Sequence, residues 1–284
     1  MTPQMRRDDH KSAIAAARRA KTAVVFAWSR RNPVFGLPGQ QDKLIEEVAA
    51  VNPNTIVVLN VSQPIAMPWI NKVRAVLLMW WPGDEGGWAT AKLLLGKANP
   101  AGRLPVTWAR RLIDYAPNDP AHPERSAKGV NGKTIYSEGV LIGYRWFDAQ
   151  HIEPLFPFGY GLSYTRFAYS DAWAQRLPDG SATVKVKVCN TGKVAGDEVW
   201  QVYLDAPADR PPGVQFAPRT LVAFDRVTLQ AGESRVVTMH ISPRAFEYWS
   251  VSEKTWRQPP GPRLLHVASS SRALRLTVKL AALQ

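Results

Sequence analysis

The chain has 284 residues, of which 45 % are hydrophobic, and carries a formal net charge of +13. This length and apolar content fit one or two globular domains with substantial cores. No run of about 18 apolar residues is present, which argues against an integral membrane segment, and Cys189 as the single cysteine excludes an internal disulfide.

The first hundred residues alternate between helical patterns and short apolar runs. Leu44, Ile45 and Val48 follow a helical spacing, whereas the run Thr22-Ala-Val-Val-Phe-Ala-Trp28 predicts a strand buried on both faces. Strands that alternate with helices across short loops indicate a mostly parallel sheet, an open α/β (flavodoxin-like) sandwich. The expected helices are 9–20, 40–51 and 87–95, and the expected strands are 22–28, 55–60, 75–80 and a shorter one at 104–108.

A connector and an aromatic segment follow. Residues 112–133 contain Pro117, Pro120 and Pro123 and show no apolar period, which predicts an exposed connector. Residues 156–164 read Phe-Pro-Phe-Gly-Tyr-Gly-Leu-Ser-Tyr, with four aromatics and no charge. Proline and glycine break a helix and the aromatics demand burial, so this segment, the strap, is predicted to pack irregularly against other structure.

From Phe167 onward the pattern changes to a period of two. Residues 182–189 alternate apolar or small side chains with polar ones, and turn residues separate this run from similar ones. Short, regularly spaced strands of this kind predict an antiparallel β-sandwich of about seven strands. The expected strands are 182–189, 198–204, 221–227, 235–241, 264–269 and 274–280.

Four phrases occur in a fixed order along the chain. They are Pro-Gly-Asp-Glu-Gly-Gly (82–87), Asn-Pro-Ala-Gly-Arg-Leu-Pro-Val-Thr-Trp (99–108), Tyr-Ser-Glu-Gly-Val-Leu-Ile-Gly-Tyr-Arg-Trp-Phe-Asp (136–148) and the strap. Together they resemble the C-terminal half of glycoside hydrolase family 3, which includes many β-glucosidases and β-xylosidases. The resemblance covers the chain from about Ala13 to its end.

The resemblance implies a division of the chain. Residues 1–116 would form a partial α/β sandwich domain, 117–166 the connector and strap, and 167–284 a fibronectin type III-like β-sandwich. In the family the α/β domain begins well before the segment that resembles this chain. Several sheet elements are therefore expected to be missing, which would leave exposed apolar surface.

The resemblance also implies a chemistry. Family members hydrolyse glycosides with retention, which requires two carboxyl groups about 5–5.5 Å apart. The family's attacking aspartate lies in a Ser-Asp-Trp motif on a preceding barrel, and this sequence contains no such motif. The acid/base of the family lies on the loop after the strand that matches residues 23–28, where this chain has no Asp or Glu between Trp28 and Asp42. Arg30 and Arg31 stand there instead and cannot donate a proton.

No catalytic residue is therefore predicted, and the chain is expected to be a glycosidase that is catalytically incomplete alone. Ligands of parallel sheets bind at the carboxyl ends of the strands. Trp28, Arg31, Phe35 and Glu85 lie near those ends and are the candidate substrate-binding residues. Glu85, like its neighbour Asp84, has an alternative role as a helix N-cap.

Other residues admit other roles. Glu138 is expected to fix the strap by pairing with an arginine such as Arg145. Several aromatics could stack on sugars, although packing is the commoner fate: Trp80, Trp81, Trp88, Trp108, Tyr144, Trp146 and Phe147. The five histidines are far apart in sequence, so no metal and no cofactor are predicted.

The charge and the N-terminus leave some alternatives open. The arginines are scattered from Arg6 to Arg275 without a nucleic-acid-binding motif, so no nucleic acid partner is predicted and a basic surface is the simpler interpretation. Residues 1–21 lack the apolar core of a signal peptide, and the compartment stays unknown, a periplasmic or secreted parent enzyme being one alternative.

Three functions remain compatible with these residues. The leading one is the C-terminal region of a β-glucosidase-like or β-xylosidase-like enzyme. The second is one subunit of a split glycosidase, which would meet its β-glycoside or oligosaccharide only together with a partner barrel chain. The third is a non-catalytic module that binds carbohydrate or acts as a scaffold.

Overall fold

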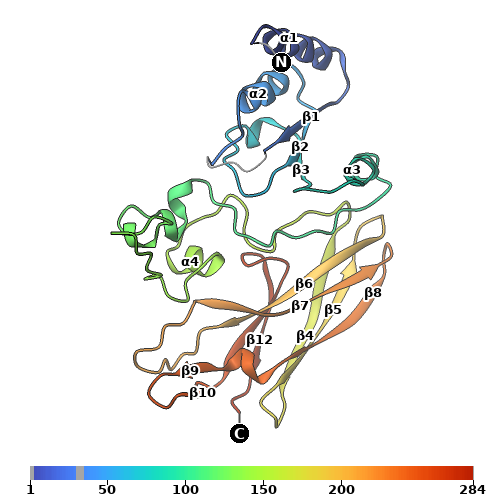
Figure 1. The fold of residues 1–284 in the computed structure, drawn as a ribbon. Helices are drawn as coiled ribbons and strands as arrows, with labels where there is room; N and C mark the ends of the chain where they lie inside the picture. Colours follow the sequence, from blue (N-terminus) through green and yellow to red (C-terminus); the bar gives the residue numbers. More distant parts are fainter. Residues whose placement is uncertain (1–2, 30–34, 284) are drawn as a thin grey trace. The chain divides into compact units, whose positions relative to one another are not determined.

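The structure, a computed structural model, describes residues 3–29 and 35–283. The chain forms two compact units (Figure 1). The first comprises Met1–Lys97 with Arg110–Leu112, and the second comprises Ala98–Ala109 with Ile113–Gln284. The three-part division at residues 116 and 166 stays a prediction.

The first unit contains a three-stranded parallel sheet in the order β1-β2-β3. This confirms the parallel α/β arrangement that the alternating pattern predicted. Its elements are α1 (Pro3–Arg19), β1 (Ala23–Trp28), α2 (Gln41–Val51), β2 (Thr55–Asn60), the short helix η1 (Ile70–Lys72), β3 (Ala75–Leu78) and α3 (Gly86–Leu94).

One face of the sheet is packed by α1 and α2. Ala17 of α1 and Val48 of α2 form a buried cluster with Ala23 of β1. The buried amide of Asn52, just after α2, donates hydrogen bonds to the carbonyl oxygens of Ala17 (2.9 Å) and Ala20 (3.0 Å). These bonds satisfy the C-terminal carbonyls of α1 and hold the two helices together.

The other face of β1 is open. Because side chains alternate along a strand, Val24, Phe26 and Trp28 point away from the helix-covered face. All three are exposed, Phe26 by 59 % and Trp28 by 54 %. The prediction that this strand is buried on both faces is therefore wrong, whereas the expected exposed apolar surface is present.

The second unit contains the predicted antiparallel β-sandwich. One sheet has the order β12-β11-β6-β7 and the other β4-β5-β8 (Figure 1). Alternate apolar side chains such as Val184, Trp200 and Leu265 are fully buried in the sandwich core. The strands are β4 (Phe167–Arg176), β5 (Ala182–Asn190), β6 (Gly196–Asp205), β7 (Arg219–Leu229), β8 (Ser234–Ile241), β11 (Arg263–Ala268) and β12 (Leu274–Leu280).

The sandwich carries an additional short hairpin that the sequence did not predict. It consists of β9 (Tyr248–Ser250) and β10 (Thr255–Arg257) and follows the short helix η5 (Pro243–Phe246). Trp249 and Trp256 are register partners in it. This hairpin lines the second candidate site described below.

The strap runs along residues 104–108 rather than forming a strand of a sheet. The Leu104 amide donates to the Tyr160 carbonyl (2.9 Å), and the Gly159 amide donates to the Leu104 carbonyl (2.8 Å). Trp108 and Phe156 form an isolated antiparallel bridge. The expected strand at 104–108 is thus only a backbone partner of the strap.

The connector before the strap is only partly exposed. It contains the short helices η2 (Leu112–Asp114), η3 (Ala116–Asn118) and η4 (Pro123–Arg125), and α4 (Tyr144–Ala149) follows. Arg125 is buried, contacts Trp146 through a cation–π interaction (5.2 Å) and pairs with Glu138 (3.6 Å). Glu138 therefore pairs with Arg125 and not with Arg145.

The two glycines of the strap permit close approaches. Gly159 has φ +78°, a conformation that side chains rarely adopt. A Cβ at Gly161 would lie closer than 3.0 Å to the backbone carbonyl oxygen of Gly102, whereas a Cβ at Gly102 would meet no atom within 4 Å. Although the two glycines contact each other, a side chain can be added at Gly102 without a clash but not at Gly161.

We expect Gly161→Ala to lower the free energy of unfolding by about 1–3 kcal/mol, because the strap or residue 102 must shift to relieve the overlap. Gly102→Ala is the matched control and is expected to change the stability by less than about 0.5 kcal/mol. Urea unfolding of both variants measures the difference. Equal stabilities of the two variants would contradict the proposed backbone contact.

Candidate functional site

The carboxyl edge of the parallel sheet is the first candidate site. It begins where β1 ends at Trp28, whose backbone is held by the side chain of Gln41 from α2. The Trp28 amide donates to Gln41 Oε1 (2.8 Å), and Gln41 Nε2 donates to the carbonyl oxygens of Trp28 (2.9 Å) and Pro38 (2.9 Å). One glutamine thus fixes both ends of the loop that follows β1.

The four predicted binding residues have different environments. Trp28 is more than half exposed, Phe35 is half-buried and Glu85 is exposed. Arg31 lies outside the described residues, as does Arg30. Glu85 is the residue before α3, and its carboxylate makes no capping hydrogen bond. Glu85 therefore does not cap α3 through a side-chain hydrogen bond. The role of Glu85 in substrate binding stays a prediction.

The tryptophans after β3 lie close to the end of β1. The Trp81 indole Nε1 donates to the carbonyl oxygen of Ser29 (3.3 Å). Trp80 has φ +52°, a strained conformation for a residue with a large side chain. Trp28, Trp81 and Trp88 are all exposed, so the first unit presents several aromatic surfaces to solvent.

The carboxylate that follows the loop has a structural partner. Asp42 Oδ1 accepts a hydrogen bond from the indole of the fully buried Trp69 (2.6 Å). Burial raises the pKa of Asp42 more than this bond lowers it. The sequence between Trp28 and Asp42 contains no Asp or Glu, so the first carboxylate after β1 is the one bonded to Trp69.

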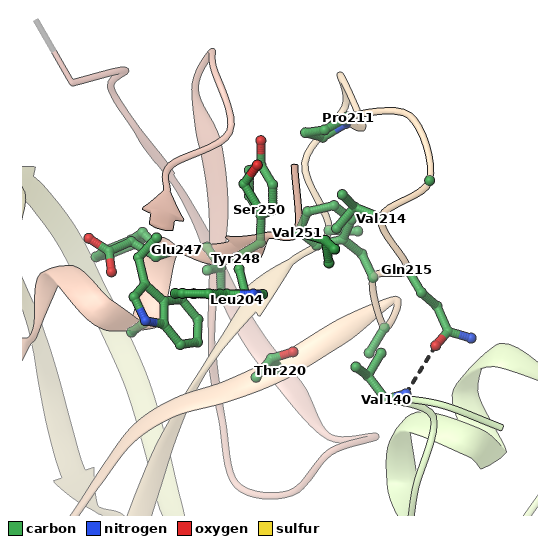
Figure 2. Close-up of a pocket in the computed structure, with 18 of the residues that line it drawn as sticks. Val140, Leu204, Pro211, Val214, Gln215, Thr220, Glu247, Tyr248, Ser250 and Val251 are labelled. Atoms are coloured by element: carbon green, nitrogen blue, oxygen red, sulfur yellow. Dashed lines mark hydrogen bonds between the residues drawn. The ribbon is translucent and has the colours of Figure 1, made fainter. Parts of the chain in front are cut away.

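The second candidate site is a hollow of about 960 Å³ in the second unit (Figure 2). It lies among the ends of β6 and β7, the loop 206–218 and the β9–β10 hairpin. Figure 2 shows Leu204 and Thr220 beside Tyr248, and at one side of the hollow the hydrogen bond from the Val140 amide to Gln215 Oε1 (3.0 Å). Gln215 Nε2 also donates to the Glu138 carbonyl (3.2 Å), which anchors this loop.

Aromatic and basic side chains line this hollow. Trp249 and Trp256 are exposed by 45 % and 44 %, and Arg145 and Arg263 lie among the lining residues. The sequence did not predict that Trp249 and Trp256 lie together, because strands of three residues are too short to show an alternating pattern. The only signal was two tryptophans separated by a polar, turn-like stretch.

The described residues form neither a metal site nor a membrane span. Among the side chains of residues 10–29 and 35–283, no three of His, Cys, Asp or Glu gather as a metal site. Within those same ranges, no helix combines the length and apolar character required to cross a bilayer.

Two family models match the chain. The glycosyl hydrolase family 3 C-terminal domain matches residues 4–164, and the fibronectin type III-like domain matches residues 198–271. The first match covers the parallel sheet, the connector and the strap, and the second covers most of the sandwich.

Known proteins show the same similarity. The chain is 42 % identical over 253 residues to a β-glucosidase of Rhizobium radiobacter, covering 87 % of this chain and 30 % of that protein. It is 39 % identical over 277 residues to the thermostable β-glucosidase B of Acetivibrio thermocellus, covering 93 % of this chain and 35 % of that protein. The chain thus spans about a third of the length of these relatives.

Solved structures agree with the sequence comparisons. The crystal structure of DesR, a β-glucosidase from Streptomyces venezuelae in complex with D-glucose, matches with a TM-score of 0.93 and 42 % identity. That match covers 99 % of this chain and 36 % of the other. The β-glucosidase 3B of Thermotoga neapolitana matches with a TM-score of 0.84 and 30 % identity, over 96 % of this chain and 39 % of that chain.

Proposed function

The chain belongs to glycoside hydrolase family 3, as the C-terminal part of its β-glucosidases, and from this premise we propose that it supplies the non-barrel portion of a retaining β-glycosidase. In this proposal the carboxyl edge of the parallel sheet contributes one wall of the glycoside site. Trp28, Arg31, Phe35 and Glu85 contact the sugar, and the nucleophile comes from a barrel. The substrate is a β-glucoside or a β-xyloside.

The open face of β1 is the observation that carries this proposal. Val24, Phe26 and Trp28 form an exposed apolar row on a sheet whose other face is packed by helices. Exposed apolar rows of this kind commonly mark surfaces that another part or partner covers. The relatives have about two thirds of their length beyond the matched region, and this remainder is the natural candidate to cover the row.

The proposal holds whether the covering part lies in the same polypeptide or in a separate one. A separate barrel chain corresponds to the split-enzyme alternative. In both cases the row is an interface, and its large apolar side chains would carry much of the association energy.

We test this with the part of the Rhizobium radiobacter β-glucosidase that precedes its matched region, mixed with the 284-residue chain. We expect the two to co-elute in size-exclusion chromatography. Phe26→Ser should weaken the association by about 2 kcal/mol or more, roughly thirtyfold in Kd. Phe224→Ser is the matched control, since Phe224 is 67 % exposed on β7, and should leave the Kd unchanged.

Two results would contradict this interface. One is an absence of co-elution at micromolar concentrations. The other is an equal loss of affinity in the Phe26 and Phe224 variants, which would mean that general surface apolarity, rather than the open face of β1, drives the association.

A further inference from the structure

The hollow in the second unit is lined by exposed indoles and arginines, which are not needed for the packing of a β-sandwich core. Every residue that lines it belongs to the second unit, so its properties can be considered independently of the carboxyl edge of the parallel sheet. Its volume of about 960 Å³ lies within the range of small-molecule sites. Its lining combines exposed indoles with basic groups.

The indoles form one wall of the hollow. Trp249 and Trp256 face each other across the β9–β10 hairpin, with ring centroids 5.4 Å apart and an interplanar angle of 67°. The guanidinium of Arg244 lies 3.8 Å from the centroid of the Trp256 ring. Each indole is nevertheless almost half exposed, so apolar ring surface remains available to a ligand. Rigid exposed indoles suit the apolar faces of sugar rings.

Two of the three carboxylates that line the hollow pair with arginines, and the third lies beside a histidine. Asp205 Oδ2 lies 2.9 Å from His266 Nε2, and Glu247 Oε2 lies 3.3 Å from Arg244 Nη1. Glu253 pairs with Arg257. The arginine partners offset the charges of Glu247 and Glu253.

Two arginines of the lining lack such partners. Arg263 is only 5 % exposed, its Nη2 donates to the Asp205 carbonyl oxygen (2.7 Å), and its Nε has no hydrogen-bond acceptor among the described residues. Burial lowers the pKa of Arg263 to about 10, so it remains charged at neutral pH. Arg145 forms no ion pair within the described part of the chain, and its guanidinium lies 5.9 Å from the Tyr144 ring centroid. Arg145 and Arg263 are therefore the two basic side chains of the lining, and neither forms an ion pair with a carboxylate among the described residues.

We propose that this hollow binds an acidic oligosaccharide, whose sugar rings stack on Trp249 and Trp256 and whose carboxylate is bound by Arg145 and Arg263. A guanidinium presents parallel N–H donors that match the two oxygens of a carboxylate. The net charge of +13 would attract an acidic chain at long range and would not attract a neutral one. A uronate-bearing oligosaccharide supplies both the ring faces and the charge, whereas an acidic peptide supplies only the charge.

The test compares two ligands that differ only in the carboxylate. Titration calorimetry of the 284-residue chain uses a glucuronic-acid-bearing xylo-oligosaccharide and the same compound with its uronic acid reduced to glucose. We expect the acidic ligand to bind at least about tenfold more tightly, with an advantage that shrinks as salt screens the charges.

Three variants assign the binding to the hollow. Trp249→Ala is expected to weaken binding of both ligands by about tenfold, and Arg145→Gln only that of the acidic ligand. Trp173→Ala is the matched control, because Trp173 is 46 % exposed on β4 and is not part of the lining. Circular dichroism and thermal unfolding establish that each variant is folded.

Several outcomes would overturn the proposal. They are no binding of the acidic ligand, equal binding of the two ligands, binding that Trp249→Ala leaves unchanged, and equally tight binding of a polyglutamate peptide. The titration requires neither hydrolysis nor a barrel. Its failure would therefore leave the proposed glycosidase role standing, and loss of that role would leave this site standing.

Discussion

The 284-residue chain alone is expected to release p-nitrophenol from p-nitrophenyl β-glucoside and β-xyloside no faster than buffer. Double displacement at an anomeric carbon needs a carboxylate nucleophile and a second carboxyl group about 5–5.5 Å away. The loop after β1 has no acid before Asp42, and Asp42 is bonded to Trp69. A continuous absorbance assay at micromolar chain concentration measures the rate.

Adding a barrel portion should restore only part of the chemistry. The barrel would bring the nucleophile, but no general acid would come from the loop after β1. Leaving groups that depart without protonation, such as 2,4-dinitrophenolate, should then be released, whereas cellobiose should not be cleaved, because general acid catalysis typically contributes about 10²–10⁴-fold. Equal turnover of the two substrates would place an acid elsewhere in the assembly.

A control distinguishes activity of the chain itself from activity of a contaminating glycosidase in the p-nitrophenol assay. If the chain alone shows turnover, Glu85→Gln and Asp42→Asn preparations must be assayed beside it. Activity that either substitution abolishes would show that this chain supplies a catalytic acid and would overturn the prediction. Activity that persists unchanged in both would come from another source or another group.

The second large effect is expected at a buried ion pair that joins residue 103 to the β-sandwich. Arg103 Nη2 lies 2.6 Å from Glu198 Oε2, and the Tyr169 hydroxyl donates to Glu198 Oε1 (2.5 Å). Both charged side chains are almost fully buried. Burial, and next the neighbouring Glu198 carboxylate, raises the pKa of Tyr169. The phenol therefore stays protonated and keeps donating.

Arg103→Met should lower the free energy of unfolding by about 3–5 kcal/mol, because it leaves the Glu198 charge buried without its partner. The double variant Arg103→Met with Glu198→Leu should recover most of this loss, since an apolar pair of similar volume is often neutral. Urea unfolding followed by tryptophan fluorescence measures both.

The control is the ion pair made by Asp197, the residue before Glu198 on β6. Arg226 pairs with Asp197, but its side chain is largely exposed. Arg226→Met should therefore change the stability by less than about 1 kcal/mol. If the two arginine variants lose equal stability, or if the double variant is as unstable as Arg103→Met, the burial argument is wrong.

Local patterns predicted much of this fold. The alternation of apolar runs and helical spacings indicated the parallel sheet, and strand β2 was predicted at its observed residues, 55–60. The two-residue period after Phe167 predicted a sandwich of about seven strands and located six of its strands, but not β4. These features are decided by short-range periodicity, which a single sequence displays.

Features that depend on distant partners were not predictable. The exposure of Phe26 depends on what covers the sheet, and the pairing of Glu138 with Arg125 depends on the path of the connector. The strap was recognised from its composition, but the sequence could not reveal that Gly161 faces the backbone of Gly102. The indole pair of the hollow requires a hairpin too short to show a period.

The geometry of the Trp249–Trp256 pair has an optical consequence. The indole centroids lie 5.4 Å apart with ring planes inclined at 67°, a distance at which transition dipoles couple, and we expect an exciton couplet in the far-ultraviolet circular dichroism. A molecule that slides over either ring changes the coupling angle or the local polarisability, and the couplet changes with it. The protein thus carries an intrinsic chromophore pair through which occupancy of the hollow can be followed without a label.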